Sequence, residues 1–138
     1  MSDTMFSTLA ISSAGMKAQS ERVRVISQNI ANSDTAPTQA GEEPYRRQLI
    51  TFKSQLDKNL GAEVVSVKDV SEDRKSDFQL KYMPGHPAAD ENGYVQMPNI
   101  NSLVETMDMR EATRSYEANM GMFTQSRDMM MKTIDIIR

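Results

Sequence analysis

Apolar residues recur at every seventh position near both ends of the chain. The N-terminal row consists of Leu9, Met16, Val23 and Ile30. The C-terminal row consists of Met109, Tyr116, Phe123, Met130 and Ile137. Because seven residues make about two turns of an α-helix, each row forms an apolar seam that one helix offers to another. The pattern therefore predicts a long helix at each end.

The N-terminal helix is expected from Asp3 to about residue 32, a length of about 45 Å. Ser2 or Asp3 is its expected cap. A second apolar row, two positions after the first, lies about 200° around the helix. This second row consists of Ile11, Ala18 and Val25. We interpret apolar rows on nearly opposite sides as packing among several chains.

The C-terminal helix is expected from Ser102 to Arg138. Ser102 and Glu105 form a capping-box pattern at its start. Met120 and Ile134 flank the apolar seam on one side. A parallel row of small side chains allows another backbone to approach closely, and consists of Ala112, Asn119, Ser126 and Thr133.

The middle of the chain begins with turn and loop residues at 33–44. Residues 45–52 are expected to form a strand or an extended arm. Residues 52–60 are expected to form one or two helical turns that end at Gly61.

Two further strands follow in the sequence pattern. Valines at positions 64, 65, 67 and 70 predict one strand. Phe78, Leu80 and Tyr82 alternate with polar residues and predict another. Asn92-Gly93 predicts a turn, after which Tyr94 and Val95 pair back.

These elements predict a mainly α fold with a small β-rich central insert. The long N- and C-terminal helices are expected to pair in a coiled-coil-like manner. We expect three segments: an N-terminal axial helix at 1–35, a loop and β-rich insert at 36–98, and a C-terminal axial helix at 99–138.

Composition excludes several classes of chemistry. The 138 residues include no Cys, which excludes disulfides, zinc–thiolate sites and cysteine nucleophiles. The net charge of −3 provides no basic field for nucleic acid. No segment approaches the roughly 20 apolar residues of a membrane span, so direct membrane insertion is not expected. The N-terminus lacks the pattern of a cleaved secretory signal.

We expect no catalytic, cofactor or metal site. His86 lies between Gly85 and Pro87, and we interpret it as a turn residue because a metal site needs several convergent ligands. The pairs Arg22 with Arg24 and Arg46 with Arg47 favour salt bridges or interface contacts over phosphate binding. Twelve methionines, mostly at helical spacing in the C-terminal segment, favour packing over copper chemistry.

The polar run Ser27–Thr35 has two compatible interpretations. Asn32 could end the helix in a left-handed conformation. Asn29 lies beside the seam residue Ile30, where a buried amide would set the register between neighbours.

Three runs of residues resemble a known family. Ser27–Thr35 closely resembles the N-terminal signature of bacterial flagellar axial proteins, the rod and hook group. Ser115–Asn119 resembles the matching C-terminal signature. Pro84–Val95, followed by Met97–Asn101, is similar to the short proximal rod subunits of that group. The linker Ala36–Glu43 departs from the pattern, because other axial proteins often pass directly from Asp-Thr to Pro-Gly-Tyr.

The resemblance implies a structural rod subunit that transmits motor torque and lines an export channel. It implies a location in the periplasmic rod of the basal body, reached through the flagellar type III export apparatus. The implied partners are copies of the chain, proximal rod subunits of the FlgB and FlgF type, the distal rod of the FlgG type, a rod-base adaptor of the FliE type and the MS ring.

The expected assembly surface combines both seams with the signature asparagines. It comprises Leu9, Met16, Val23, Asn29, Ile30, Asn32, Met109, Tyr116, Asn119, Met120, Phe123, Met130, Ile134 and Ile137. One alternative is a soluble coiled-coil adaptor or export chaperone, which would form a discrete oligomer. A second alternative is a small hydrolase, which only scattered carboxylates support.

Overall fold

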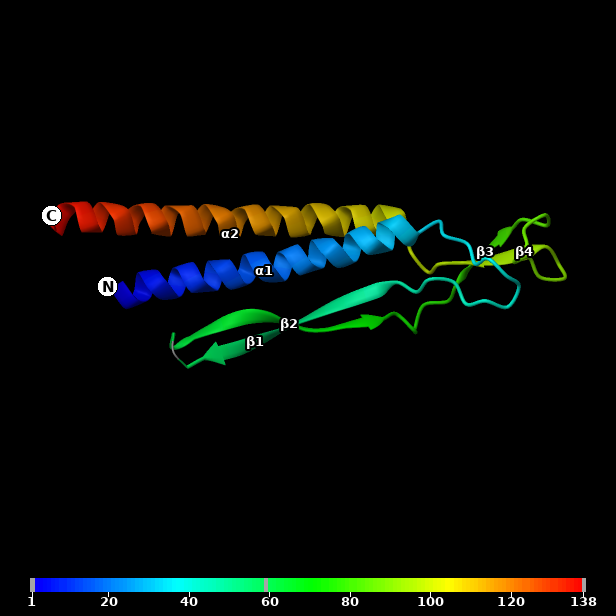
Figure 1. Cartoon of the computed structure of the whole chain (residues 1–138), viewed down its shortest axis with the longest axis horizontal. Helices are drawn as coiled ribbons and strands as arrows, with labels where there is room; N and C mark the ends of the chain where they lie inside the picture. Colours follow the sequence, from blue (N-terminus) through cyan, green and yellow to red (C-terminus); the bar gives the residue numbers. More distant parts are fainter. Residues whose placement is uncertain (1, 59, 138) are drawn as a thin grey trace. The chain divides into compact units, whose positions relative to one another are not determined.

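The computed structural model describes residues 2–58 and 60–137, with the side chains of residues 5–58 and 60–136. Within this range the elements are α1 (Ser2–Asn32), β1 (Gln48–Asp57), β2 (Ala62–Glu72), β3 (Gln79–Tyr82), β4 (Tyr94–Met97) and α2 (Ser102–Ile137) (Figure 1). β1 pairs with β2 and β3 pairs with β4. The prediction of two terminal helices around a small β-rich middle is confirmed, and coiled-coil pairing stays a prediction.

The chain divides into two compact units, and both helices contribute to each. Unit 1 contains Met1–Val23, Ile50–Asp69 and Arg110–Arg138. Unit 2 contains Arg24–Leu49 and Val70–Met109. Over the described residues, neither helix has a stretch long and apolar enough to cross a membrane.

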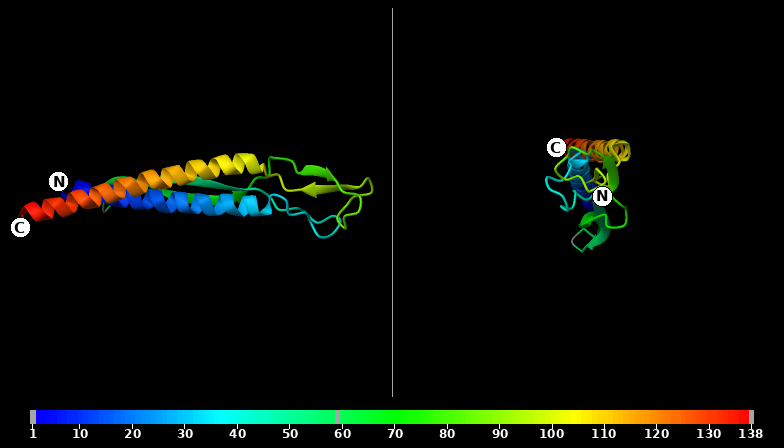
Figure 2. Two further views of the ribbon diagram at one scale, coloured as in Figure 1. Left: turned by 90° about the horizontal axis from the view of Figure 1, so that it is seen from above. Right: turned by 90° about the vertical axis from the view of Figure 1, so that its right-hand side faces the viewer.

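In unit 1, α1 lies between two other elements (Figure 2). The α2 segment runs antiparallel along one side of α1, and the β1–β2 hairpin lies along the other. Ala14 and Ala18 line a groove beside Val65 and Val67 of β2. Ala18, from the second apolar row, is buried here by the chain's own hairpin. Our interpretation that this side of α1 requires several chains is therefore wrong at Ala18.

The hairpin also corrects the expectation for residues 52–60. β1 continues to Asp57, and the backbone N–H of Gly61 donates to the carbonyl of Asp57 at 2.9 Å. Gly61 has a φ of 60°, which suits glycine in a tight turn. The helical turn does not form because hydrogen bonding to β2 outweighs the weak helix preference of the local sequence.

In unit 2, the predicted pairing of β3 with β4 is confirmed. Residues 83–93 connect the two strands, and the predicted turn at Asn92-Gly93 is the last turn of this connection, where the Gly93 N–H donates to the Asp90 carbonyl at 3.0 Å. The antiparallel register pairs Leu80 with Gln96 and Tyr82 with Tyr94. Because strand side chains alternate between faces, β4 buries one face and exposes the other. The buried face contributes to the core of unit 2, which includes Val25, Ile26, Val95, Met97 and Ile100.

Gly93 supports this hairpin with a backbone conformation that other residues rarely adopt. Its φ is 83°, and an added methyl group would lie 3.0 Å from side-chain atoms of Tyr82 and Pro84. We predict that Gly93→Ala lowers the free energy of unfolding by about 1 kcal/mol or more. Urea unfolding of the purified protein measures this change.

Gly85 provides a matched control in the same connection. An added methyl group there meets no atom within 4 Å, and Gly85 does not have a positive φ. Gly85→Ala is expected to change stability by less than about 0.5 kcal/mol. Equal effects of the two substitutions would contradict the role given to Gly93.

Candidate functional site

The contact between α1 and α2 in unit 1 is built on small side chains. A methyl group at Gly15 would lie 2.8 Å from the side-chain oxygen of Asn119, so the two helices approach closely there. Ala112 and Ser126 lie seven residues to either side of Asn119 and are buried. Arg22 and Glu111 form an ion pair across the same helices at 3.8 Å. The expected close approach along the small-residue row is present at Asn119.

The residues of the two expected seams are only partly buried in the subunit. Side chains of intermediate exposure are Leu9, Met16, Val23, Ile30, Asn32, Met109, Tyr116, Asn119, Phe123 and Met130. Met120 and Ile134 are exposed. The side chain of Ile137 lies outside the described residues. The seams therefore retain apolar surface for further contacts, and their role in assembly stays a prediction.

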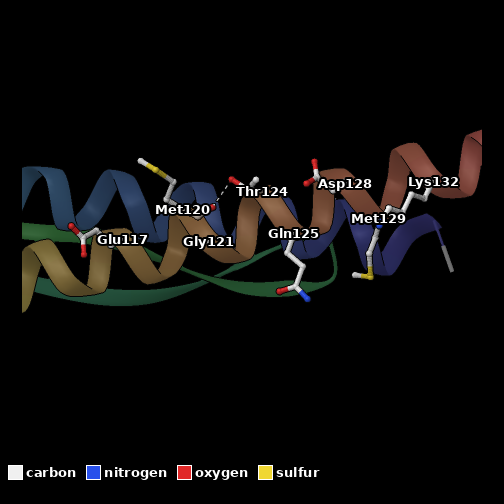
Figure 3. Close-up of a pocket in the computed structure, with 8 residues that line it drawn as sticks. All are labelled: Glu117, Met120, Gly121, Thr124, Gln125, Asp128, Met129 and Lys132. Carbon is white, nitrogen blue, oxygen red and sulfur yellow. Dashed lines mark hydrogen bonds between the residues drawn. The ribbon is translucent and has the colours of Figure 1, made fainter.

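The outer face of α2 carries a shallow hollow at Gly121 (Figure 3). Met120 and Met129 point to opposite sides of the helix at this hollow. An added methyl group at Gly121 would meet nothing within 4 Å. Glycine inside a helix costs about 1 kcal/mol relative to alanine. At Gly121, no close contact within the described subunit requires a glycine and so compensates for this cost.

Asn29 occupies the centre of a buried polar cluster in unit 2. Its side chain is 1% exposed. Its amide nitrogen donates to the Gln48 carbonyl at 2.9 Å, and its oxygen accepts from the Gln48 N–H at 2.9 Å. The Tyr45 hydroxyl donates to the same oxygen at 3.4 Å. The amide of Asn29 therefore joins segments of its own chain, which corrects the interpretation that it sets a register between neighbouring chains.

Glu105 joins α2 to this cluster. Its carboxylate is 1% exposed, accepts from the Asn29 amide at 3.0 Å, and pairs with the Arg47 Nε at 2.6 Å. Arg47 also lies 3.5 Å from Asp108. The buried charge is thus compensated by a guanidinium and a neutral donor, as burial of a carboxylate requires. Burial raises the pKa of the Tyr45 hydroxyl, and the charge of Glu105 adds to that effect.

A second asparagine connects the arm before β1 to the end of β2. Asn99 accepts from the Arg47 N–H at 2.8 Å and donates to the Asp73 carbonyl at 3.0 Å. The Asp73 N–H in turn donates to the Arg47 carbonyl at 2.8 Å. Arg46 and Arg47 form the salt bridges expected from the sequence. No sequence pattern pointed to Glu105, Gln48 or Asn99 as their neighbours in this cluster.

Two expectations about the helix ends are wrong. The cap of α2 is Asn101, whose side-chain oxygen accepts from the Leu103 N–H at 3.0 Å, while Glu105 turns into the buried cluster. No described residue other than glycine has a positive φ, so Asn32 is not left-handed. Asn32 instead donates to the Gln28 carbonyl at 2.8 Å.

His86 is a turn residue, as predicted. Its backbone N–H donates to the Met83 carbonyl at 3.0 Å, and its ring Nδ1 accepts from the backbone N–H of Ala88 at 3.1 Å. Among the residues whose side chains are described, no group of three or more His, Cys, Asp or Glu is arranged to hold a metal ion.

We predict that Asn29→Ala lowers the free energy of unfolding by about 1–3 kcal/mol, because it leaves buried partners without hydrogen bonds. Asn32→Ala provides the control. It removes a bond within one helix and is expected to cost under about 1 kcal/mol. Urea unfolding compares the two variants, and a cost for Asn32→Ala equal to that for Asn29→Ala would contradict the central role of Asn29.

Asp73 predicts a pH dependence of stability. A hydrogen bond from the Ser76 hydroxyl, followed by one from the Lys75 N–H, lowers the pKa of Asp73 below its ordinary 3.8. Because the folded state binds this proton less tightly than the unfolded chain, the stabilisation is complete above that value and lost as pH falls through the lowered pKa. The stability difference between the natural protein and Asp73→Asn should therefore shrink on acidification from about pH 5 to about pH 2. A difference independent of pH in urea unfolding would contradict this assignment.

Comparisons with known proteins agree with the signatures at both ends. The model of the family described as "Flagella basal body rod protein" matches residues 9–36. The model described as "Flagellar basal body rod FlgEFG protein C-terminal" matches residues 91–136.

Full-length relatives are similar to this chain. The flagellar basal-body rod protein FlgC of Agrobacterium fabrum is 46% identical over 136 residues, covering 99% of this chain and 97% of the relative. FlgC of Borreliella burgdorferi is 38% identical, covering 97% and 98%, and FlgC of Bacillus subtilis is 37% identical, covering 96% and 98%. The chain therefore belongs to the flagellar basal-body rod protein FlgC family.

Proposed function

We propose that this chain is a structural subunit of the proximal rod of the bacterial flagellar basal body. The observation that carries the proposal is the apolar surface that α2 exposes in a chain of the rod family. Its exposed large apolar residues are Leu103, Val104, Met107, Met120, Met122, Met129, Met131, Ile134 and Ile136. Exposed apolar surface of this extent marks an interaction surface.

Methionine suits this surface because its flexible side chain adapts to contacts that differ from one neighbour to the next. Packing between helices buries apolar area in many small contacts. Motor torque would thus be spread over a large interface rather than over a few strong bonds. In this proposal residues 1–35 and 99–138 form the axial helices, and residues 36–98 form the outer part.

The polar row of α2 suits the wall of an export channel. Glu117, Gln125, Asp128 and Lys132 line the hollow at Gly121 (Figure 3). Charges of both signs keep this row hydrated without creating a strong field of one sign. Such a wall would bind a passing polypeptide weakly.

The proposed partners are other copies of the chain and neighbouring rod components: proximal subunits of the FlgB and FlgF type, the distal rod of the FlgG type, a base adaptor of the FliE type and the MS ring. The proposed location is the periplasmic rod, after type III export without cleavage of a signal peptide. The role is mechanical, and we propose no catalytic activity.

We predict that Met120→Asp abolishes rod assembly and swimming while the isolated subunit still folds. Met120 is 45% exposed, so the substitution costs the subunit little, typically within about 0.5 kcal/mol. In the assembled rod it would place a charge against apolar surface, which is costly without a partner. Swimming assays, purification of basal bodies and circular dichroism of the subunit measure these outcomes.

Asp128→Ala is the control on the polar row of the same helix. Asp128 is exposed and pairs with the adjacent Arg127, a contact worth under about 1 kcal/mol. Cells carrying it should swim normally. Normal rods with Met120→Asp would refute the apolar surface as the assembly surface. A discrete soluble oligomer in place of rods would favour the coiled-coil adaptor.

A further inference from the structure

In the distal half of the β1–β2 hairpin, Val65 and Val67 of β2 lie beside α1, whereas the β1 strand is exposed. β1 alternates between partly buried and exposed positions up to Phe52, after which residues 53–56 are all exposed. Leu56 is 59% exposed and has exposed lysines, Lys53 and Lys58, near it in the sequence. An exposed leucine of this kind suits a contact with another molecule.

Unit 2 contains a groove whose apolar lining could accept a leucine side chain. It has a volume of about 430 Å³ and lies between the loop at 37–43 and the β3–β4 hairpin. Phe78, Leu80 and Tyr94 provide its apolar lining. Leu80 is 66% exposed and lies on β3, whose four residues are all exposed. Exposed apolar and aromatic side chains around a groove are typical of an interaction site.

The rim of this groove is acidic. Glu42 accepts from the Thr38 N–H at 2.9 Å and from the Thr38 hydroxyl at 2.8 Å. Asp90 accepts from the Asn92 and Tyr94 N–H groups at 2.9 and 2.8 Å. Because these donors are neutral, they orient the two carboxylates without cancelling their charge. The hydrogen bond from the Thr38 hydroxyl is also the main cause that lowers the pKa of Glu42, which keeps it ionised.

We propose that the distal half of the β1–β2 hairpin of one copy docks into this groove of a second copy. Leu56 would occupy the apolar lining between Phe78 and Leu80. Lys58, just beyond the end of β1, would lay its aliphatic stem over Tyr94 and place its ammonium group near the acidic rim. The inference rests on the proposed role as a rod subunit and names one contact between its copies.

Such a contact has a consequence for assembly. The hairpin tip and the groove are different surfaces of the same chain, so the interface is heterologous. A heterologous contact leaves one free tip and one free groove at the ends of each pair. It therefore propagates into a ring or a helical array rather than stopping at a dimer.

Disulfide trapping tests the contact directly, because the natural chain has no cysteine. Leu56→Cys and Leu80→Cys are introduced into separate copies with different tags, and both are produced in cells without the native subunit. Both side chains are exposed, so the variants should fold. A disulfide requires Cα atoms within about 7 Å. We expect a covalent dimer with both tags in basal bodies after mild oxidation.

Val70→Cys is the matched control for Leu80→Cys. Val70 is 36% exposed, belongs to the same unit and does not line the groove. If the cells swim but the Leu56 thiol forms disulfides equally with both positions, or with neither, the docking contact is refuted. The proposed rod function would still stand in that case, because the cells swim. A link formed only within one chain, or only to another protein, would overturn it as well.

A charge test does not depend on cysteine chemistry. Lys58→Glu should abolish swimming, because it places a like charge against the acidic rim. Lys68→Glu, at another exposed lysine of the hairpin, should leave swimming unchanged. Normal swimming with Lys58→Glu would also refute the proposal.

Discussion

The side-chain amide of Asn29 is the interaction on which unit 2 depends. It uses both donor hydrogens and its acceptor oxygen to join the end of α1 to the start of β1 and to the first turn of α2. A carboxylate has no donor for the Gln48 carbonyl, and an aliphatic side chain has neither group. Glu105 is acceptable at this depth only because Asn29 and Arg47 satisfy it. The amide thus fixes the chain path where three distant segments meet.

Unit 1 follows a different principle. Its helix contact at Gly15 and Asn119 is built on small residues, which allow close approach but bury little apolar area. Its larger apolar residues, such as Met122 and Ile134, remain exposed instead. Unit 1 therefore leaves apolar surface uncovered within the subunit, whereas unit 2 buries its central polar cluster.

Local pattern was sufficient for elements whose residues determine their own conformation. The two helices follow from seven-residue periodicity, and the β3–β4 turn follows from the positive φ that Gly93 adopts. Predictions from the local pattern were wrong where a contact with a distant segment replaces the predicted local structure. Residues 53–57 extend because β2 pairs with them, and Glu105 leaves its helix cap because the partly buried guanidinium of Arg47 pairs with it.

The sequence alone determined the helical ends, the β-rich middle and the family signatures, because periodicity and turn residues act over a few positions. One of two compatible interpretations of the run Ser27–Thr35 placed Asn29 in a buried position. Only the tertiary structure decided the partner of Asn29, which is Gln48 rather than a neighbouring chain. It likewise decided that Ala18 is covered by the chain's own hairpin. An apolar row indicates that a helix packs against a partner. Which segment is that partner depends on how the rest of the chain folds back onto the helix.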